Sequence, residues 1–553
     1  MSRQFLLRRG WALAWAALVL VSYAVRTPVP IDETRYLSVA WEMWLRGNFL
    51  VPYLNGATYS HKPPLMFWLF QLGWEVFGVN GWWPRLVPPL FALGAMFLTA
   101  ALARRLWPER PQARLLAPWL LAGSFYWAFY TSATMFDMIL TAFAVAGMLG
   151  IWIAGQGRGV AGWLLTGVAC GLGILTKGPV MLLLIAFGAL LGPWWSDYAR
   201  RRPLLWYGGL VVAIAIGAGL ALSWALSAGY RGGAAYEEAI LWHQTADRVV
   251  DSFAHRRGWW WYLPLLPVML FPWLMWPPLY RAVAGLRGKL DRGLRFVIAW
   301  AVPTYIAFSL ISGKQPHYLL PIFPAFALLA ARALEQSPVP AGRWSQAVPA
   351  AFLVVAGILL LAVPLLRLDS LPAWVAEIRP LWGVMLAGLG VLIVLRTWDR
   401  ATDAVMSLAV VSVVATMVFV GGFFQAARGA YDVTPAARYL STLQHEDLPV
   451  AHIGTYHGQF QFFGRLRKPL VVLRHGQLHH WAEQHPNGRV VVYSSDPPPN
   501  TGPQPDFLQR YKGEWLAIWE ASVLCSMPQC TPGGFLGHGA ALPASQQDRG
   551  LEQ

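Results

Sequence analysis

Long apolar segments separated by short polar stretches recur along most of the chain. A helix of about 17–25 apolar residues crosses a hydrocarbon core about 30 Å thick. Because lipid offers the backbone no hydrogen-bond partners, such segments must be helices. The pattern predicts about thirteen spans, at residues 11–26, 84–103, 115–130, 136–154, 161–176, 179–194, 204–227, 262–280, 295–311, 317–334, 347–365, 379–396 and 404–423.

Two longer polar segments interrupt this pattern, at residues 27–83 and 228–261. Within the first, residues 33–44 have helical apolar spacing and residues 63–77 are strongly apolar. Both stretches are typical of amphipathic helices that lie in the membrane interface.

The pattern changes again after the last apolar segment. A helical signal at residues 434–443 is followed by short β-rich runs at 449–453, 469–473 and 489–493, which predicts a small α/β domain. The final residues, 532–553, are rich in Gly, Ala and Gln and are expected to be disordered. We therefore predict an all-α polytopic membrane domain over residues 1–425 and an α/β domain over residues 426–531.

Composition excludes a soluble protein, since 56% of the residues are hydrophobic and 13% are charged. The 31 Trp residues suit a protein with two membrane interfaces. A net charge of +16 invites a nucleic-acid partner, but the arginines cluster in short loops between apolar segments. That distribution is typical of cytoplasmic loops, so membrane lipids and no nucleic acid are the expected partners.

The same charges predict the orientation. Arg3, Arg8 and Arg9 precede the first apolar segment, which places the N-terminus in the cytoplasm. We interpret this segment as an uncleaved anchor, with a cleaved signal peptide as the alternative. The segments at 27–83, 228–261 and 426–531 then face outward, where Cys525 and Cys530 would pair only in an oxidising compartment.

Carboxylates stand at the outer ends of two spans. Asp32 and Glu33 follow the first span, and an acidic pair there can act as a general base or hold a cation. The alternative for Asp32 is a helix N-cap. Asp137 lies in the apolar stretch MFDM, where an ionisable group indicates function unless it only forms a structural ion pair.

Three lysines also lie at outer span ends, beside Gly or Pro. Lysine generally prefers cytoplasmic loops, so the outer positions of Lys62, Lys177 and Lys314 are unusual. A snorkelling anchor explains one such lysine, but three are better explained by an anionic ligand. A lipid-linked phosphate is the anion expected at this interface.

Four outward histidines raise the question of a metal. Imidazole is a common zinc ligand, but His61, His243, His255 and His317 show no short ligand spacing. We favour surface or hydrogen-bonding roles and keep a divalent metal at His61, His243 and His255 as the alternative.

Motifs in a fixed order along the membrane portion resemble a known family. They are IDETRY at 31–36, WEMW at 41–44, YSHKPPLMFW at 59–68, WWPRL at 82–86, MFDM at 135–138, LTKGPV at 175–180, WHQTADR at 242–248, HRRGWWWYLP at 255–264 and SGKQPHYLLP at 312–321. The chain is similar to bacterial lipid-phosphate-dependent glycosyltransferases of the GT-C class, the group that includes protein O-mannosyltransferases and lipid A aminoarabinose transferases.

This resemblance implies roles for individual residues. Asp32 would be the catalytic carboxylate, and Asp137 would occupy a pocket position. Because of its apolar setting, we also predict that Asp137 is catalytic. Lys62 and Arg248 would bind a polyprenyl phosphate, with Tyr59 beside them. The remaining substrate-binding positions would be Glu33, Arg35, Tyr36, Arg85, Lys177, Lys314 and Tyr318.

Two departures from the family pattern concern the metal and the sugar. The family usually has Glu before Lys-Pro-Pro, where this chain has His61, so a metal held by that Glu is in doubt. Gln315 and His317 stand where the aminoarabinose enzymes usually have Leu and Thr, which leaves the identity of the sugar open.

The resemblance predicts an enzyme of the bacterial inner membrane that transfers a sugar from a polyprenyl phosphate to a periplasmic acceptor. Lipid A or another envelope glycolipid is the expected acceptor, with a protein hydroxyl as the alternative. A transporter of lipid-linked sugars is an alternative of a different class. Transporters carry their functional charges near the bilayer midplane, whereas these charges gather at one face.

Overall fold

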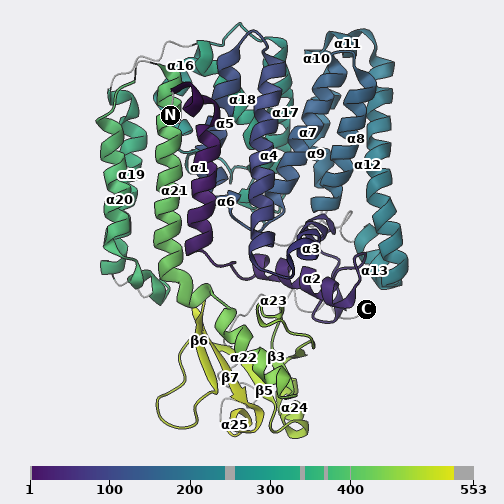
Figure 1. Ribbon diagram of the computed structural model, residues 1–553, viewed down its shortest axis with the longest axis vertical. Helices are drawn as coiled ribbons and strands as arrows, with labels where there is room; N and C mark the ends of the chain where they lie inside the picture. The colour runs from purple at the N-terminus through teal and green to yellow at the C-terminus, as the bar shows by residue number, and fades with distance from the viewer. Residues whose placement is uncertain (1–2, 243–255, 337–342, 367–370, 399, 528–553) are drawn as a thin grey trace.

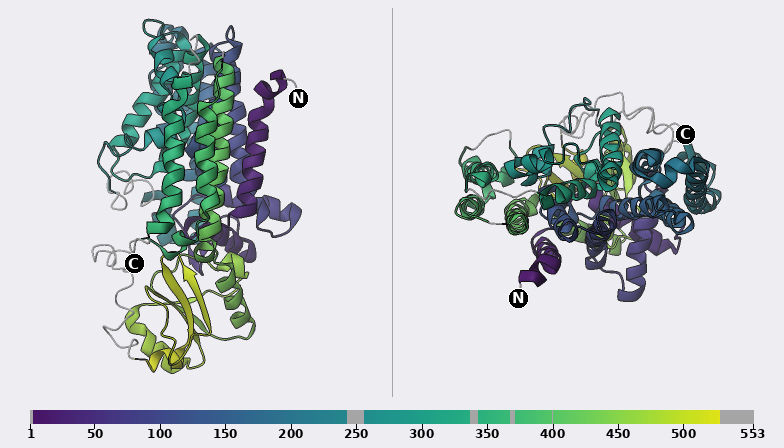
Figure 2. Two further views of the ribbon diagram at one scale, coloured as in Figure 1. Left: turned by 90° about the vertical axis from the view of Figure 1, so that its left-hand side faces the viewer. Right: turned by 90° about the horizontal axis from the view of Figure 1, so that it is seen from above.

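The computed structural model describes residues 3–242, 256–336, 343–366, 371–398 and 400–527. Most of the chain forms a bundle of helices, with a small sheet domain beyond one end of it (Figure 1, Figure 2). The helices of the bundle are α1 (Arg3–Val25), α4 (Trp82–Leu106), α5 (Pro111–Ala122), α6 (Phe125–Thr131), α7 (Asp137–Gly155), α8 (Gly159–Lys177), α9 (Val180–Leu190), α10 (Gly192–Trp195), α11 (Asp197–Arg201), α12 (Pro203–Gly232), α13 (Ala234–Glu238), α15 (Leu266–Met269), η2 (Trp273–Met275), α16 (Pro277–Ala284), α17 (Arg292–Leu310), η3 (Pro316–Ile322), α18 (Phe323–Gln336), η4 (Arg343–Gln346), α19 (Ala347–Leu366), η5 (Ala373–Glu377), α20 (Pro380–Val394) and α21 (Ala401–Tyr431).

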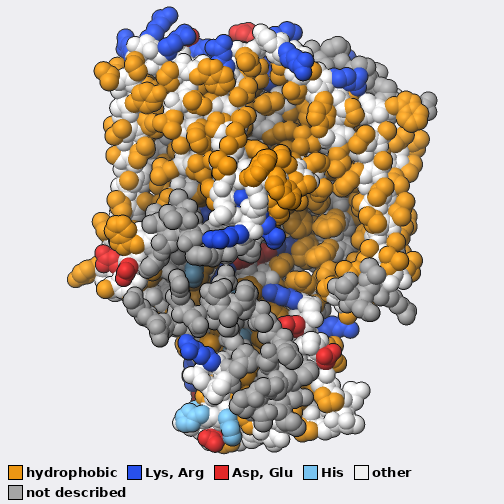
Figure 3. Space-filling model, turned by 180° about the vertical axis from the view of Figure 1, so that it is seen from behind, with side chains coloured by type: hydrophobic (Ala, Val, Ile, Leu, Met, Phe, Trp, Pro, Cys, Tyr) orange, Lys and Arg blue, Asp and Glu red, His pale blue; other side chains and the backbone are white. Residues whose placement is uncertain are grey.

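The helical bundle has the dimensions and surface of a multi-pass membrane protein. Within the described residues, nine helices are long and apolar enough to cross a bilayer. Figure 3 shows hydrophobic side chains covering the height of the bundle, with Lys and Arg gathered along the end farthest from the sheet domain. The prediction of a polytopic helical protein with a small α/β domain is confirmed.

The number of full-length spans is smaller than the thirteen predicted. The segment at 115–130 divides into α5 and α6, and α9 and α20 are shorter than the other spans. The prediction of a span at 262–280 is wrong, because this segment forms only α15, η2 and α16. Five prolines between residues 264 and 278 remove backbone donors and prevent one continuous helix.

Close backbone contact joins α7 and α8, which carry two residues of the candidate site at their ends. A Cβ on Gly162 would lie 2.4 Å from the backbone nitrogen of Ala154, and one on Gly150 would lie 2.5 Å from Thr166 Oγ1. Small residues at these crossings let membrane helices approach and pack by van der Waals contact. The packing therefore fixes the α7 and α8 ends relative to each other.

The first long polar segment, residues 27–83, forms a layer between the bundle and the sheet domain (Figure 1). It contains α2 (Asp32–Arg46), a hairpin of β1 (Tyr53–Leu54) and β2 (Ala57–Thr58), and α3 (Leu65–Phe77). The two predicted helices of this segment are confirmed. One face of α2 packs through Tyr36, Val39 and Met43 into a buried cluster with α3.

The C-terminal part is a five-stranded mixed sheet with helices on both faces. Its elements are α22 (Thr434–His445), β3 (Val450–Ile453), α23 (Gln461–Gly464), β4 (Val471–Leu473), η6 (His475–Gln477), α24 (Leu478–Gln484), β5 (Arg489–Ser494), β6 (Phe507–Tyr511), β7 (Glu514–Glu520) and α25 (Ala521–Cys525). The strand order is β4-β3-β5-β7-β6, with β3 parallel to β4 and β5, and with β7 antiparallel to β5 and β6.

Alternation along β5 builds two cores in this domain. Val491 packs toward α22, whereas Val490 and Val492 pack toward α24 and α25, as the two-residue period of a strand requires. The predicted helix and three strands are confirmed, and the β6–β7 hairpin is additional. Cys525 ends α25, while Cys530 lies outside the described residues, so their pairing stays a prediction.

Candidate functional site

A cavity of about 340 Å³ lies where the layer formed by α2 and α3 meets the ends of the bundle helices. Two carboxylates and three cations line it, together with polar and aromatic side chains: Asp32, Arg35, Tyr36, Lys62, Tyr130, Met135, Phe136, Asp137, Lys177, Gln315, His317 and Tyr318. Residues that are far apart in the sequence, from Asp32 to Tyr318, thus meet in one place. We call this the catalytic cavity.

Asp32 lies at the start of α2 with its side chain half exposed. Ile31 occupies the N-cap position, and the Asp32 carboxylate instead pairs with Arg35 and accepts a hydrogen bond from Tyr36 Oη at 3.3 Å. Burial, followed by the nearby Asp32 charge, raises the pKa of Tyr36 well above its usual value. Tyr36 therefore remains a neutral phenol that donates to the carboxylate.

Asp137 and Lys177 form a buried ion pair on the opposite wall of the catalytic cavity. Lys177 Nζ lies 2.6 Å from Asp137 Oδ1. Asp137 begins α7 and Lys177 ends α8, so each charge is also stabilised by its helix dipole. Asp137 Oδ2 is buried and has no hydrogen-bond partner among the described residues, which leaves an acceptor for a ligand hydroxyl.

Aromatic rings close the wall around Lys177. Its ammonium lies 4.7 Å from the centroid of the Tyr318 ring, a cation–π distance. The His317 ring lies 4.8 Å from Tyr318 and stacks on Tyr130 at 5.7 Å. These rings exclude water from the ion pair and offer apolar faces to a sugar ring.

Lys62 lines the catalytic cavity from the loop between β2 and α3. The preceding Tyr59 is buried, with its ring packed against Phe67 at 6.4 Å. Pro63 and Pro64 follow Lys62 and restrict the backbone there. A cation on a short, rigid loop is thereby presented to the cavity.

Glu33 faces away from the catalytic cavity and forms a buried clamp. It pairs with Arg26 and accepts a hydrogen bond from the Thr134 backbone N–H at 3.1 Å. Arg26 also donates to the Ser132 carbonyl at 2.7 Å. This clamp ties the start of α2 to the loop before α7, and therefore Asp32 to Asp137.

Arg85 supports the same clamp rather than lining the cavity. Its guanidinium donates to the Arg26 carbonyl at 2.6 Å and lies 4.2 Å from the centroid of the Tyr23 ring. Lys314 is also outside the lining set, because its buried ammonium donates to the carbonyls of Arg257, at 3.0 Å, and Ile311. The structure thus brings neither residue to the catalytic cavity.

The described side chains around the cavity form no cluster of metal ligands. His61 is exposed, with its ring 5.3 Å from that of Tyr59. In the part of the chain that the structure describes, no three His, Cys, Asp or Glu side chains are grouped as metal ligands. His243, Arg248 and His255 lie outside the described residues, and their predicted roles stay predictions.

The cavity also contains residues that sequence reasoning did not assign to it. Tyr130, at the end of α6, lacks any motif of its own. Gln315 and His317 differ from the residues that the family usually has at these positions. That difference did not predict a role for either residue in the cavity. Arg26 directly follows the first span, and its burial could not be read from the sequence.

The sequence is similar to a family of glycosyltransferases and to several aminoarabinose transferases. Residues 61–224 match the model of the dolichyl-phosphate-mannose-protein mannosyltransferase family. An undecaprenyl phosphate-alpha-4-amino-4-deoxy-L-arabinose arabinosyl transferase of Pseudomonas fluorescens is 32% identical over 308 residues, which are 55% of either chain. One from Pseudomonas aeruginosa is 33% identical over 343 residues, 60% of either chain. The matched region thus spans less than two thirds of these relatives.

The fold matches over nearly the whole chain. The crystal structure of ArnT from Cupriavidus metallidurans in the apo state has a TM-score of 0.73 at 20% identity, covering 93% of this chain and 98% of that one. The structure of ArnT bound to undecaprenyl phosphate has a TM-score of 0.72. The chain therefore has the GT-C fold of ArnT, and it is similar in sequence to the aminoarabinose transferases over rather more than half of its length.

Proposed function

We propose that the protein is a glycosyltransferase that moves a sugar from a polyprenyl phosphate to an acceptor at the outer face of the bacterial inner membrane. The observation that carries this proposal is the catalytic cavity, in which Asp32 and Asp137 lie among Lys62, Arg35 and Lys177. An excess of cations suits a phosphate, and the carboxylates suit hydroxyl groups. The names of the relatives support a lipid-linked donor.

In this proposal the acceptor oxygen attacks the anomeric carbon of the donor sugar. The bond from that carbon to the phosphate oxygen breaks, and its electron pair leaves with the polyprenyl phosphate. Lys62 stabilises the charge that grows on the phosphate. Asp32 accepts the proton of an acceptor hydroxyl, or orients an acceptor phosphate that needs no base.

The second carboxylate has a positioning role in the proposed reaction. Asp137 Oδ1 is held by Lys177, while Oδ2 is buried without a described partner. A sugar hydroxyl that donates to Oδ2 would satisfy it, and the Tyr318 ring beside Lys177 would pack against the sugar. Binding of the sugar thereby aligns its anomeric carbon with Asp32.

The location follows from the donor. Each lipid methylene drawn into water costs about 0.8 kcal/mol, so the donor is bound with its tail in the membrane. The catalytic cavity lies at the end of the bundle nearest the sheet domain, and a row of Lys and Arg side chains lies along the opposite end of the bundle (Figure 3). The positive-inside rule then places the N-terminus in the cytoplasm and the cavity in the periplasm.

Lipid A, or another envelope glycolipid, is the acceptor that we propose, because the two relatives described above are aminoarabinose transferases. A protein hydroxyl is the second candidate. It is favoured by one observation, the match of residues 61–224 to a protein mannosyltransferase family. A transporter would not need the buried Asp137–Lys177 pair at a membrane face.

Reconstitution tests this proposal directly. Purified protein in nanodiscs is mixed with lipid A and undecaprenyl phosphate carrying either aminoarabinose or a hexose, and the products are identified by mass spectrometry. We expect transfer from one of these donors, and none when the sugar is supplied as a nucleotide sugar. Transfer to added envelope proteins but not to lipid A would select the second candidate, and transfer to neither would contradict the proposal.

A further inference from the structure

A second cavity lies where α2 and the β1–β2 hairpin meet the sheet domain. It has a volume of about 360 Å³, and the reaction proposed above makes no use of it. Six polar side chains on its wall carry the argument: Glu42, Arg46, Asn55, Gln461, Arg467 and Lys468. We call it the seam pocket.

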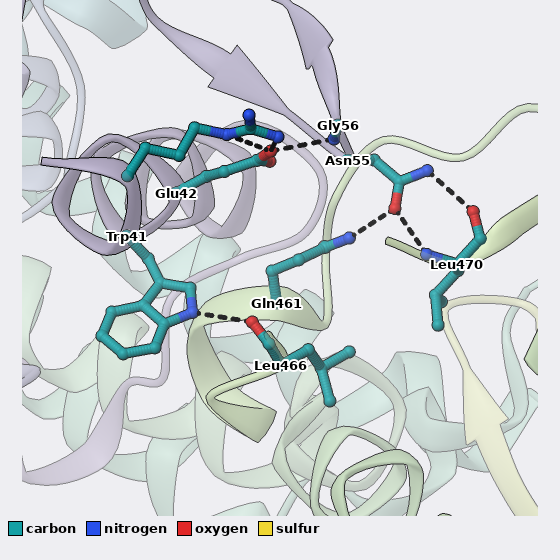
Figure 4. Close-up of polar contacts among 8 residues, drawn as sticks. Trp41, Glu42, Asn55, Gly56, Gln461, Leu466 and Leu470 are labelled. Carbon is teal, nitrogen blue, oxygen red and sulfur yellow. Dashed lines mark hydrogen bonds and ion pairs between the residues drawn. The ribbon is translucent and has the colours of Figure 1, made fainter. Parts of the chain in front are cut away.

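Hydrogen bonds across the seam hold its walls in place (Figure 4). The Trp41 indole donates to the Leu466 carbonyl at 3.0 Å. The Asn55 side chain accepts from the Leu470 N–H at 2.8 Å and from Gln461 Nε2 at 2.9 Å, and it donates to the Leu470 carbonyl at 3.0 Å. Because these walls are already ordered, a ligand would bind with little loss of conformational entropy.

Positive charge is in excess among the side chains that line the seam pocket. Arg46 pairs with Glu42 at 2.7 Å, and Glu42 also accepts from the Gly56 N–H at 2.9 Å. Arg467 forms no side-chain hydrogen bond or ion pair with any described residue, and the pair of Lys468 with Asp447, at 2.6 Å, is exposed. Exposed pairs are weak, so two cations remain for an anionic ligand.

The seam pocket and the catalytic cavity lie along the same helix. Residues seven and eleven positions apart lie on nearly the same helical face, so Arg35, Glu42 and Arg46 follow one side of α2. The rise from Arg35 is about 10 Å to Glu42 and about 16 Å to Arg46. A lipid headgroup about 10–16 Å long therefore reaches from the catalytic cavity to the seam pocket.

We propose that the seam pocket binds a phosphate group of the acceptor glycolipid while the reacting oxygen of that acceptor lies in the catalytic cavity. This inference rests on the proposed function and adds a recognition site to it. Arg467 and Lys468 donate to the phosphate oxygens, while Arg46 stays paired with Glu42. The sheet domain thereby selects phosphorylated acceptors.

Binding and transfer are measured separately to test this inference. Full-length protein in detergent is titrated with bisphosphorylated lipid A, with phosphate-free lipid A and with phosphatidylglycerol, and inorganic phosphate serves as competitor. The variants are Arg467→Ala combined with Lys468→Ala, and, as control, Arg438→Ala on the exposed face of α22. Both variants change exposed side chains, and their melting temperatures verify folding.

The double variant should bind bisphosphorylated lipid A about tenfold more weakly, as expected for loss of charge-assisted hydrogen bonds, and should raise the KM for it similarly. Its affinity for phosphate-free lipid A should be unchanged, as should all affinities of Arg438→Ala. If the double variant lost as much affinity for phosphatidylglycerol or for phosphate-free lipid A as for bisphosphorylated lipid A, the inference would be overturned. So would normal binding and KM in the double variant when the wild type transfers sugar to lipid A. A wild type that binds lipid A in this phosphate-dependent way without modifying it would refute the proposed acceptor reaction instead.

Discussion

Asp32 and Asp137 line the same cavity but have different surroundings. The Asp32 carboxylate is half exposed and shared by Arg35 and Tyr36, whereas Asp137 is buried against Lys177. An accessible carboxylate can meet an incoming acceptor, and a buried ion pair is held in one position. We therefore propose that Asp32 accepts the proton of an acceptor hydroxyl or orients an acceptor phosphate, and that Asp137 orients the sugar.

This assignment predicts that Asp32→Asn lowers the transfer rate by at least about a hundredfold, since general base catalysis typically contributes that much or more. Asn keeps the shape of the side chain, and the N-cap position of α2 belongs to Ile31 rather than to Asp32, so the protein should fold. Turnover in nanodiscs and the melting temperature are measured together. Asp496→Asn, in an exposed loop of the sheet domain, is the matched control. Full activity of Asp32→Asn would show that the carboxylate has only a structural role.

Lys62→Ala should weaken binding of undecaprenyl phosphate by about tenfold or more, because a charge-assisted hydrogen bond at a poorly hydrated site contributes about 1.5–3 kcal/mol. Lys62→Arg should retain part of the affinity, since the charge survives and the geometry changes. Titration of the purified variants measures this effect, with exposed Lys289→Ala at the other end of the bundle as control. If Lys62→Ala binds undecaprenyl phosphate with unchanged affinity, Lys62 does not bind the phosphate, and Lys177 becomes the next candidate.

At the scale of elements, the ends of α2, α7 and α8 build the site, and the clamp of Arg26 and Glu33 sets their spacing. Glu33→Gln leaves a buried arginine without its charge partner. Breaking a buried pair in this way costs about 3–5 kcal/mol. The melting temperature in nanodiscs should therefore fall clearly, whereas exposed Glu75→Gln on α3 should leave it unchanged. Equal melting temperatures would mean that the clamp does not hold α2 in place.

Sequence patterns predicted the elements whose signals are local. The length of the apolar segments predicted most helices of the bundle. Apolar composition and helical spacing predicted α2 and α3. The apolar length of the segment at 262–280 predicts a span, but its prolines prevent one continuous helix. The β1–β2 hairpin was missed although Asn55-Gly56 is a strong hairpin signal; both residues have positive φ, 52° and 87°.

The parts of the site that could not be predicted depend on tertiary packing. Charge at the predicted outer ends of spans indicated Asp32, Lys62, Asp137 and Lys177, and the structure places all four in one cavity. By contrast, Glu33 stands beside Asp32 in sequence but points into the clamp. Adjacent helical residues face directions about 100° apart, so neighbourhood in the chain did not imply a shared site.

For the whole molecule, the position of the sheet domain is fixed by its connection to the bundle. Helix α21 continues out of the bundle as far as Tyr431, and the tip of the β6–β7 hairpin returns to it, with the Lys512 N–H donating to the Ala430 carbonyl at 2.7 Å. The seam with α2 adds a second attachment. The domain therefore lies next to the catalytic cavity rather than on a free linker.

The proposed orientation predicts opposite reporter signals at the two ends of the bundle. Fusions after Ala430 should give a periplasmic signal and fusions after Arg104 a cytoplasmic one, because the basic loops stay inside. Alkaline phosphatase and green fluorescent protein reporters measure this in cells. Signals from the same side would refute the topology and the periplasmic location of the cavity.

The central claim, sugar transfer to an envelope acceptor through Asp32, is tested most directly by mass spectrometry of lipid A and envelope proteins. Cells that lack the protein are compared with cells complemented by the wild type or by Asp32→Asn at equal expression. We predict that lipid A gains the mass of one sugar residue only with the wild type. Identical lipid A and envelope proteins in all three strains would contradict the account.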